Sequence, residues 1–333
     1  MENIGLLKDK YKIIIWGFKP KNGIVENTIT YVWNSFYRAF QKLGFETHWF
    51  PNEAVENFDF TNCIFISEGY DDSFMPLEKS SVYFVHCAWD PSRYVGKVGR
   101  FIDLRYNLIQ IEHPNYIYKL DKANAEKLYK GCYYEPSSNK IVEFKNGRVS
   151  YNIDDFEKVY VSWATNLMPD EINEDDVYIK RSNCVYFLGS LCADKEFYNI
   201  DLVEEFANEC RINGIEFSIN PFSASTQLSE EAYVAKSKES LLGFDVRCRR
   251  ASEWGQIACR IFKNMSYGHL GLTNTLEAYN ELEGHCVYRE SSSELFHAGM
   301  EQRENYEFIK EGLKYIRDHH TYINRAKSLL KII

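Results

Sequence analysis

Short apolar runs alternate with helically spaced apolar residues in the first part of the chain. Lys12–Phe18 is an apolar run closed by Gly17, the pattern of a buried parallel strand. From Ile29 to Leu43, apolar residues recur at steps of three and four, which predicts an amphipathic helix. Phe45–Phe50 then has the pattern of a second strand. A strand, a helix and a second strand in this order indicate a parallel sheet.

The alternation continues to the end of the chain. Further strands are predicted at Asn62–Ser67, Ser81–His86, Val159–Trp163, Cys184–Gly189, Ile215–Ile219, Leu241–Val246, Leu270–Thr273 and Cys286–Tyr288, and further helices at about Leu202–Asn213, Leu228–Lys238, Ile257–Tyr267 and Arg303–Leu330. Residues 100–158 are less regular, and part of them is interpreted as a hairpin insertion. The acidic, turn-prone segment 168–182 separates two arrays of strands and helices.

The expected fold class is therefore α/β, with two Rossmann-like domains. Residues 1–170 would form the first domain and residues 183–302 the second. Residues 303–333 are expected to form a C-terminal helix that can pack back onto the N-terminal domain. The chain has 333 residues, of which 45% are hydrophobic, and this is sufficient for two buried cores.

Composition narrows the classes of partner. Aromatic residues make up 16% of the chain. Aromatic-rich packing is the simpler interpretation, and rings that line a groove and stack on sugars are the alternative. The formal net charge of -9 argues against an extended polyanion, such as a nucleic acid, as the partner.

The cysteines and the apolar runs bear on the cellular compartment. The nine cysteines include no Cys-x-x-Cys pair, which favours reduced thiols in a cytoplasmic protein over a disulfide scaffold or a zinc site. The apolar run Ile13–Trp16 is far too short for a signal core or a membrane span. No transmembrane segment is expected, whereas peripheral membrane contact stays open.

Glycine follows two predicted strand ends, at Gly17 and at Gly189-Ser190, where parallel sheets bind ligands. Neither glycine continues as Gly-x-Gly-x-x-Gly. The chain also lacks Gly-x-x-x-x-Gly-Lys-Ser/Thr, His-Glu-x-x-His and Gly-x-Ser-x-Gly. These absences argue against a dinucleotide site, a P-loop, a zinc protease and a serine hydrolase.

The segment Gly255–Gly268 has the most informative pattern. Arg260 and Lys263 lie on one face of the predicted helix, close to its start, where free N–H groups and the helix dipole attract anions. An arginine fork and a lysine charge at such a place suit a diphosphate. A solvated basic face on an ordinary helix is the alternative.

Part of this segment, Arg260-Ile-Phe-Lys-Asn-Met-Ser-Tyr-Gly268, resembles the R-x-F-E-x-x-A-x-G segment of CgeB-like glycosyltransferases, relatives of the GT-B group. Other short segments resemble the same family in the same order: Val185–Ser190, Ser237-Lys238, Gly271–Asn274, Val287-Tyr288, Ser293–Leu295 and His320–Ala326. The resemblance covers about residues 183–330. The N-terminal half matches the family only in architecture.

The resemblance implies a GT-B-like fold, in which two Rossmann-like domains face each other across a cleft. It implies a cytoplasmic glycosyltransferase, of the kind used in polysaccharide biosynthesis, that moves a hexosyl or related sugar from a nucleotide-sugar. The second domain would bind this donor, and the first a glycan, lipid-linked or protein acceptor. Transfer would be metal-independent and would need no cofactor. In agreement, the chain has no Asp-x-Asp motif, which metal-dependent glycosyltransferases of the other major architecture usually use.

The resemblance also implies a set of donor-binding residues. The donor and its phosphates would be bound by Gly189, Ser190, Lys238, Arg260, Lys263, Thr273 and Asn274. Lys263 stands where the family has an acidic residue that holds the donor ribose, so another residue binds the ribose or Lys263 binds phosphate. Glu277 is a substitute ribose acceptor, and an exposed helical carboxylate is the simpler interpretation.

A direct displacement also needs a general base. Glu68, His86 and Asp90 follow predicted strand ends in the N-terminal half, and His86 and Asp90 rank first. Histidine has a suitable ordinary pKa, and a structural role is its alternative. Trp89 offers a stacking face for a sugar, and Glu26 is a further candidate base. In a retaining reaction no such base is required, and these residues would only orient the acceptor.

Two other functions stay open. One is a catalytically silent nucleotide-sugar-binding module, which the lysine at position 263 favours. The other is a nucleotide-sugar enzyme of the epimerase or phosphorylase type. A likeness in fold does not by itself decide among the three.

Overall fold

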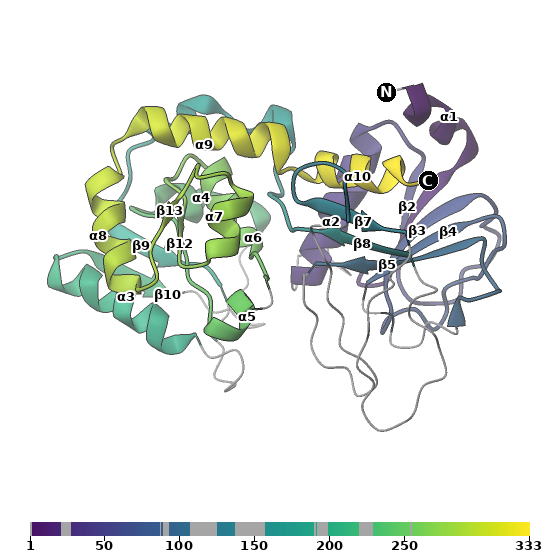
Figure 1. The fold of residues 1–333 in the computed structure, drawn as a ribbon, viewed down its shortest axis with the longest axis horizontal. Coiled ribbons are helices and arrows are strands. Elements are labelled where there is room, and N and C mark those ends of the chain that lie inside the picture. The colour runs from purple at the N-terminus through teal and green to yellow at the C-terminus, as the bar shows by residue number, and fades with distance from the viewer. Residues whose placement is uncertain are drawn as a thin grey trace. The chain divides into compact units, whose positions relative to one another are not determined.

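The computed structural model describes residues 2–20, 28–86, 88, 93–106, 125–136, 157–189, 191, 199–219, 229–253 and 255–333. The chain forms two compact units (Figure 1). Of the described residues, the first unit contains those up to Ser162 together with Tyr322–Ile333, and the second contains Trp163–Thr321. The chain therefore returns to the first unit after it has built the second.

The first unit is built on an eight-stranded sheet with the order β2-β1-β3-β4-β5-β8-β7-β6. Neighbouring strands from β2 to β8 are parallel, and β7 is antiparallel to both β8 and β6. The α/β class with a parallel sheet is thus confirmed. The elements are α1 (Glu2–Lys10), β1 (Lys12–Trp16), α2 (Thr28–Lys42), β2 (Thr47–Phe50), β3 (Cys63–Glu68), β4 (Val82–His86), β5 (Arg100–Arg105), β6 (Glu126–Lys127), β7 (Cys132–Glu135), β8 (Glu157–Val161) and α10 (Tyr322–Lys331).

The irregular stretch 100–158 contains both a predicted and an unpredicted feature. The strands β6 and β7 form an antiparallel pair, in agreement with the expected hairpin. The strand β5 is a full member of the parallel sheet, between β4 and β8, and the sequence pattern did not predict it. Its charged residues Asp103 and Arg105 are buried and form an ion pair.

Helix α2 covers one face of the sheet with the apolar stripe that its sequence predicts. Trp33, Phe36 and Phe40 on this helix are fully buried. The ring of Tyr322, at the start of α10, lies edge-on to Phe36 with 5.0 Å between ring centroids. The last helix of the chain therefore packs beside α2 (Figure 1).

A buried arginine fixes α10 to the sheet. Arg325 is fully buried, and its Nε donates to the carbonyl oxygen of Ser162 at 2.9 Å. Its Nη2 donates to Ser162 Oγ and its Nη1 to the carbonyl oxygen of Lys130, each at 2.8 Å. One side chain thus satisfies polar groups at the end of β8 and in the turn before β7.

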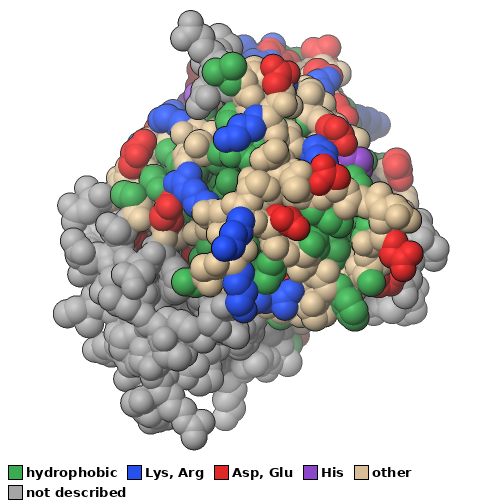
Figure 2. Space-filling view, turned by 90° about the vertical axis from the view of Figure 1, so that its right-hand side faces the viewer, with side chains coloured by type: hydrophobic (Ala, Val, Ile, Leu, Met, Phe, Trp, Pro, Cys, Tyr) green, Lys and Arg blue, Asp and Glu red, His purple; other side chains and the backbone are tan. Residues whose placement is uncertain are grey.

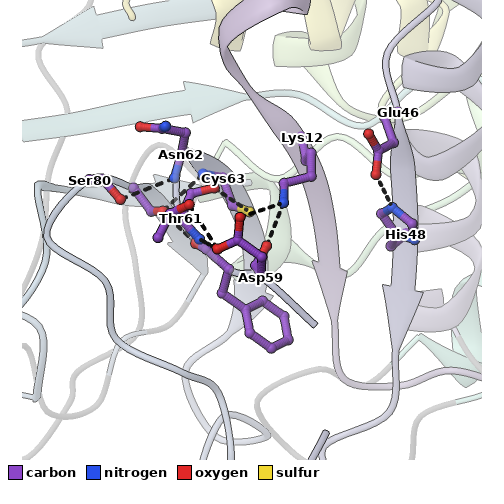
Figure 3. Close-up of polar contacts among 10 residues, drawn as sticks. Lys12, Glu46, His48, Asp59, Thr61, Asn62, Cys63 and Ser80 are labelled. Carbon is purple, nitrogen blue, oxygen red and sulfur yellow. Dashed lines mark hydrogen bonds and ion pairs between the residues drawn. The ribbon is translucent and has the colours of Figure 1, made fainter. Parts of the chain in front are cut away.

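The turn that leads into β3 is held by Asp59 (Figure 3). Its Oδ1 accepts hydrogen bonds from Thr61 N at 3.0 Å and Thr61 Oγ1 at 2.8 Å. Lys12 Nζ, at the start of β1, lies 3.5 Å from Asp59 Oδ2. These contacts, first among them the bond from the Thr61 backbone, lower the pKa of Asp59. The cluster fixes the amino ends of β1 and β3, away from the edge where parallel strands bind ligands.

The second unit has a parallel pair, β10-β9, and a parallel three-stranded sheet, β11-β12-β13. Helix α3 packs against α8, and α6 packs against α9 (Figure 1). The elements are η3 (Pro169–Glu171), η4 (Glu174–Tyr178), β9 (Cys184–Phe187), α3 (Ile200–Ile212), β10 (Glu216–Ile219), α4 (Glu230–Glu239), β11 (Phe244–Asp245), α5 (Arg249–Glu253), α6 (Cys259–Ser266), β12 (Leu272–Thr273), α7 (Leu276–Glu281), β13 (Val287–Tyr288), α8 (Ser292–Gln302) and α9 (Tyr306–His319).

The prediction of one long helix from Arg303 to Leu330 is wrong. The segment forms two helices, α9 and α10, with a break at His320 and Thr321. Thr321 forms a parallel β-bridge with Thr165, whose N–H donates to the carbonyl oxygen of His320 at 3.1 Å. This extended pairing takes the backbone out of the helix, and the apolar spacing of the sequence does not reveal it.

The short helix η4 is tied to α9 by charge. The Glu174 carboxylate lies 2.7 Å from Arg317 Nη1, 3.3 Å from Lys310 Nζ and 3.5 Å from Lys314 Nζ. The hydrogen bond from Arg317 is the main reason why the pKa of Glu174 falls to about 2. The ionised carboxylate therefore contributes to the attachment of η4.

We expect Glu174→Gln to destabilise the protein modestly at neutral pH and to matter less in acid. Because the folded-state pKa is about 2 and the ordinary value is 4.5, the stabilisation is present above about pH 4.5 and is lost as the pH falls towards 2. Urea unfolding of both proteins at neutral pH and at about pH 3 measures this loss. Glu301→Gln, an exposed glutamate of the same unit, is the control. A difference in unfolding free energy that stays the same at both pH values would contradict the prediction.

Candidate functional site

The first strand of each unit has its second and third strands on opposite sides. In the first unit, β1 lies between β2 and β3. In the second unit, β9 pairs with β10 on one side, and on the other Leu241 N, just before β11, donates to Cys184 O at 2.8 Å. At such a point the chain leaves neighbouring strands in opposite directions and opens a crevice at their carboxyl ends, where open α/β sheets bind ligands. The residues after β1, β3, β9 and β11 are therefore candidates.

In the second unit, Arg260 from the first turn of α6 reaches the ends of β9 and β11. Its Nη1 lies 3.1 Å from Asp245 Oδ1, at the end of β11. Its guanidinium carbon lies 4.4 Å from the ring centroid of Phe187, the last residue of β9. A Cβ at position 189 would overlap Arg260 Nη2, so the absence of a side chain at Gly189 makes room for the guanidinium. The structure thus brings together Gly189 and Arg260, two of the predicted donor residues.

A second arginine completes this cluster. Burial raises the pKa of Asp245, and the guanidinium groups of Arg260 and Arg247 oppose the rise. Desolvation lowers the pKa of Arg247. Within the described part of the chain, Asp245 Oδ2, Arg247 Nε and Arg260 Nε are buried without a hydrogen-bond partner. The charges of both guanidinium groups act on one carboxylate, so the cluster has an excess positive charge. Arg247 Nη2 donates to Gln256 Oε1 at 2.6 Å, and the Nε groups of both arginines are left as donors for an anion.

Two further features support an anion at this place. Helix α6 begins after Ala258 with no hydrogen bond from a capping side chain, so its first N–H groups and its dipole add to the positive potential. Asn274 holds the backbone of Arg247 on both sides. Its Oδ1 accepts from Arg247 N at 2.7 Å, and its Nδ2 donates to Arg247 O at 3.0 Å. Asn274 therefore positions the second arginine.

Three other predicted donor residues lie in the same unit. Thr273 is fully buried at the end of β12. Lys263, on α6, is largely buried, and its Nζ lies 4.5 Å from the ring centroid of Tyr233, a cation–π contact. Glu277 is partly exposed in the first turn of α7. The contact with Tyr233 directs the Lys263 ammonium group towards α4.

Lys238, which was predicted to bind the donor, contacts a carboxylate of its own unit. Its Nζ lies 2.5 Å from Asp176 Oδ2, and the two side chains form an ion pair. This pair ties the end of α4 to η4, so the Lys238 ammonium group is engaged by Asp176 and not by the anion cluster. Ser190 lies outside the described residues.

In the first unit, Glu68 and His86 form a pair at the ends of the neighbouring strands β3 and β4. Glu68 Oε2 lies 2.8 Å from His86 Nδ1. Glu68 is fully buried, whereas the His86 side chain is 13% exposed. Burial raises the pKa of Glu68, and the charge and hydrogen bond of His86 oppose the rise. When Nδ1–H donates to Glu68, Nε2 has the lone pair that a general base needs. Asp90, Trp89 and Glu26 lie outside the described residues.

Sequence reasoning missed several residues of both crevices. Asp245 lies at the end of the predicted strand Leu241–Val246 and Arg247 directly follows it, and their charged types at that position are the signal that could have found them. In the first unit, Phe18 N donates to Asp71 Oδ2 at 2.9 Å, across the crevice between β1 and β3. Phe18 has a φ of 49°, which is rare for a bulky residue and costs about 1–3 kcal/mol. Such strain persists only where the surrounding contacts enforce it.

A pocket of about 370 Å³ opens at another edge of the second unit. Its lining includes Tyr178, Arg303 and Tyr306, together with the segments that precede β11 and β12. It therefore lies at the amino ends of these strands, whereas the arginine cluster lies at their carboxyl ends. No residue predicted from the sequence for the donor site lines it.

The surface in Figure 2 is mixed in charge. Lys, Arg, Asp and Glu side chains lie side by side on this face, interspersed with hydrophobic ones. No helix in the described ranges is long and apolar enough to cross a membrane. Among the same residues, no group of three or more His, Cys, Asp or Glu side chains is placed to hold a metal ion.

No protein-family model matches this chain, and a comparison with curated proteins finds no match. The geometry of the two crevices and the resemblance of the short motifs are therefore the features that indicate a function.

Proposed function

We propose that the protein is a glycosyltransferase that moves a hexosyl or related sugar from a nucleotide-sugar to an acceptor without a metal ion. The observation that carries the proposal is the buried cluster of Arg260, Arg247 and Asp245 in the crevice of the second unit. The leaving group of such a donor is a nucleoside diphosphate, or a nucleoside monophosphate for a CMP-sugar. Fixed guanidinium groups and a helix start can stabilise its charge, which is the role a metal ion has in other enzymes.

The proposal includes a GT-B-like arrangement, in which the first unit binds the acceptor and the second binds the donor. The strand order supports this arrangement, because it is the same in both units. In each unit the first strand, β1 or β9, lies between the second strand, β2 or β10, and the third, β3 or β11. The described cysteines all have free thiols, and all but Cys259 are buried, which supports a cytoplasmic location.

In a direct displacement, the acceptor hydroxyl oxygen forms a bond to the anomeric carbon of the donor sugar. The bond from that carbon to the diphosphate oxygen breaks, and its electron pair stays with the diphosphate, beside Arg260 and Arg247. The hydroxyl proton passes to Nε2 of His86. Glu68 holds Nδ1–H and stabilises the imidazolium that forms, so it acts as a positioning residue.

The test is thermal unfolding with a panel of UDP-, GDP-, ADP-, CMP- and dTDP-sugars in metal-free buffer. A ligand that binds only the folded state stabilises it by about 2.7 kcal/mol at a hundredfold excess over its Kd. A shift with one nucleotide, followed by transfer of its sugar in an acceptor screen, is the expected result. Binding without transfer would favour the silent module, and an isomerised sugar would favour the epimerase type. No shift with any donor would overturn the proposal.

We expect Gly189→Ala to weaken donor binding roughly tenfold while the protein stays folded. The added Cβ would displace the Arg260 guanidinium from its place between Phe187 and Asp245. Titration calorimetry with the donor identified above measures the affinity. Gly5→Ala in α1, where nothing lies within 4 Å of the added Cβ, is the matched control. An unchanged affinity in Gly189→Ala would show that the position of this guanidinium does not matter.

A further inference from the structure

Aromatic rings gather at the crevice of the first unit, in the loops after β1 and β3. Tyr70 is 54% exposed and Phe74 is 59% exposed. Phe18 lies edge-on to Tyr70, with 5.5 Å between ring centroids. Exposed large apolar side chains grouped in this way indicate a binding surface.

The backbone that presents these rings is held rigidly by two polar side chains. Asp71 Oδ2 accepts from Phe18 N at 2.9 Å, and Asn52 Nδ2 donates to Asp71 Oδ1 at 3.1 Å. Asn52 Oδ1 in turn accepts from Phe74 N at 3.0 Å. A Cβ at Gly17 would lie 2.7 Å from Asp71 Oδ2, so the loop after β1 can approach this closely because it has a glycine. The strained φ of Phe18 is thus enforced by its neighbours.

The loop after β3, which carries Tyr70 and Phe74, begins beside the pair of Glu68 and His86. Gly69 N donates to the carbonyl oxygen of His86 at 2.7 Å, and Asp71 N donates to that of Glu68 at 3.1 Å. Tyr70 therefore follows Gly69, whose N–H is bound to His86, the residue that would receive the acceptor proton. A group that rests on Tyr70 would lie in the crevice where the strand order changes direction.

We infer that the acceptor is a carbohydrate and that Tyr70, supported by Phe18, is the face on which its sugar ring stacks. This inference rests on the proposed function, because it is the transfer reaction that requires an acceptor. A pyranose ring presents C–H bonds on its face and hydroxyl groups at its edge. The crevice matches both. Ser73 Oγ accepts from Asn52 Nδ2 at 3.0 Å and keeps its own O–H to donate, and the Asp71 carboxylate oxygens have lone pairs beyond those that Phe18 N and Asn52 Nδ2 use. A lipid chain would require a continuous apolar surface, which these polar groups interrupt.

The test is direct binding of neutral oligosaccharides to the full chain, without any donor. Cellotetraose, maltotetraose and chitotetraose are the probes, and saturation-transfer NMR reports which sugar protons touch the protein. We expect at least one probe to bind, Tyr70→Phe to retain this binding, and Tyr70→Ser to weaken it roughly tenfold. Tyr129→Ser, a tyrosine of the same unit that is 41% exposed, is the matched control and should bind as the wild type does.

Equal binding by Tyr70→Ser and the wild type would overturn the inference, and so would the failure of all three probes to bind folded protein. Binding of phosphatidylcholine vesicles or of a serine-rich peptide that depends on Tyr70 would also overturn it. Its failure is distinguishable from failure of the proposed function. Nucleotide-sugar binding that persists without sugar binding at Tyr70 removes only the acceptor assignment, whereas sugar binding without any donor binding removes the transfer reaction.

Discussion

Arg260→Ala is expected to lower kcat/KM for sugar transfer by roughly 10²- to 10³-fold. The guanidinium lies at the carboxyl ends of β9 and β11 and at the start of α6, held by Phe187, Gly189 and Asp245. In that fixed position it can bind the diphosphate more strongly as negative charge develops. The loss should therefore appear in kcat as well as in KM, and steady-state kinetics with the identified donor measures both.

Two variants separate the role of Arg260 from a general effect on the fold. Arg260→Lys keeps the charge but loses the planar fork and the stack on Phe187, so an intermediate loss is expected. Arg211→Ala, which removes an exposed arginine from the last turn of α3, should have wild-type kinetics. Without Arg260, the buried Asp245 carboxylate retains only Arg247 as an opposite charge. Melting curves of all variants check that the second unit stays folded under this change. Wild-type kcat/KM in Arg260→Ala would refute the donor site.

Arg325→Ala is expected to reduce the free energy of unfolding of the first unit by about 3 kcal/mol. The substitution removes three hydrogen bonds from a charged donor and leaves the buried Ser162 O and the partly buried Lys130 O without them. It also leaves a cavity where the side chain lay, since Arg325 is fully buried. Helix α10 should then separate from α2 and β8 before the rest of the sheet unfolds. Urea unfolding and hydrogen exchange of the α10 amides measure these two effects.

The matched control is Lys327→Ala, two residues further along α10, where the side chain is only partly buried. It removes the same charge from the same helix and should change the unfolding free energy by less than about 0.5 kcal/mol. Equal effects of the two substitutions would show that helix charge, and not the buried hydrogen bonds of Arg325, holds α10 in place.

The apolar pattern determined most of the elements from the sequence alone. Ile13–Trp16 and Cys184–Phe187 are continuous apolar runs, and both form strands of parallel sheets. The stripe in Thr28–Lys42 forms the helix that covers the first sheet. These predictions succeed because strands and helices bury their side chains with a fixed period, so the order of residues within each segment indicates which of them are buried.

The strand β5 shows where this reasoning fails. Its sequence, Arg100-Phe-Ile-Asp-Leu-Arg105, places three charged residues among three apolar ones, and the charged ones suggest an exposed side. In the structure Asp103 and Arg105 are buried and pair with each other. A charge can be buried only where an opposite charge or a hydrogen bond meets it, and the sequence does not say which charges meet.

For the candidate site, the sequence determined the residue types and the strand ends, and the tertiary structure decided which of them belong together. Gly189 and Arg260 were each suggested by a local pattern, but their contact depends on how α6 packs against β9. Asp245 and Arg247 join them only because β11 runs beside β9. Lys238 likewise pairs with Asp176, a residue far away in the sequence, because η4 packs beside the end of α4. Local periodicity fixes how each segment folds, whereas the neighbours of a side chain come from segments far away in the sequence, and only packing brings them within reach.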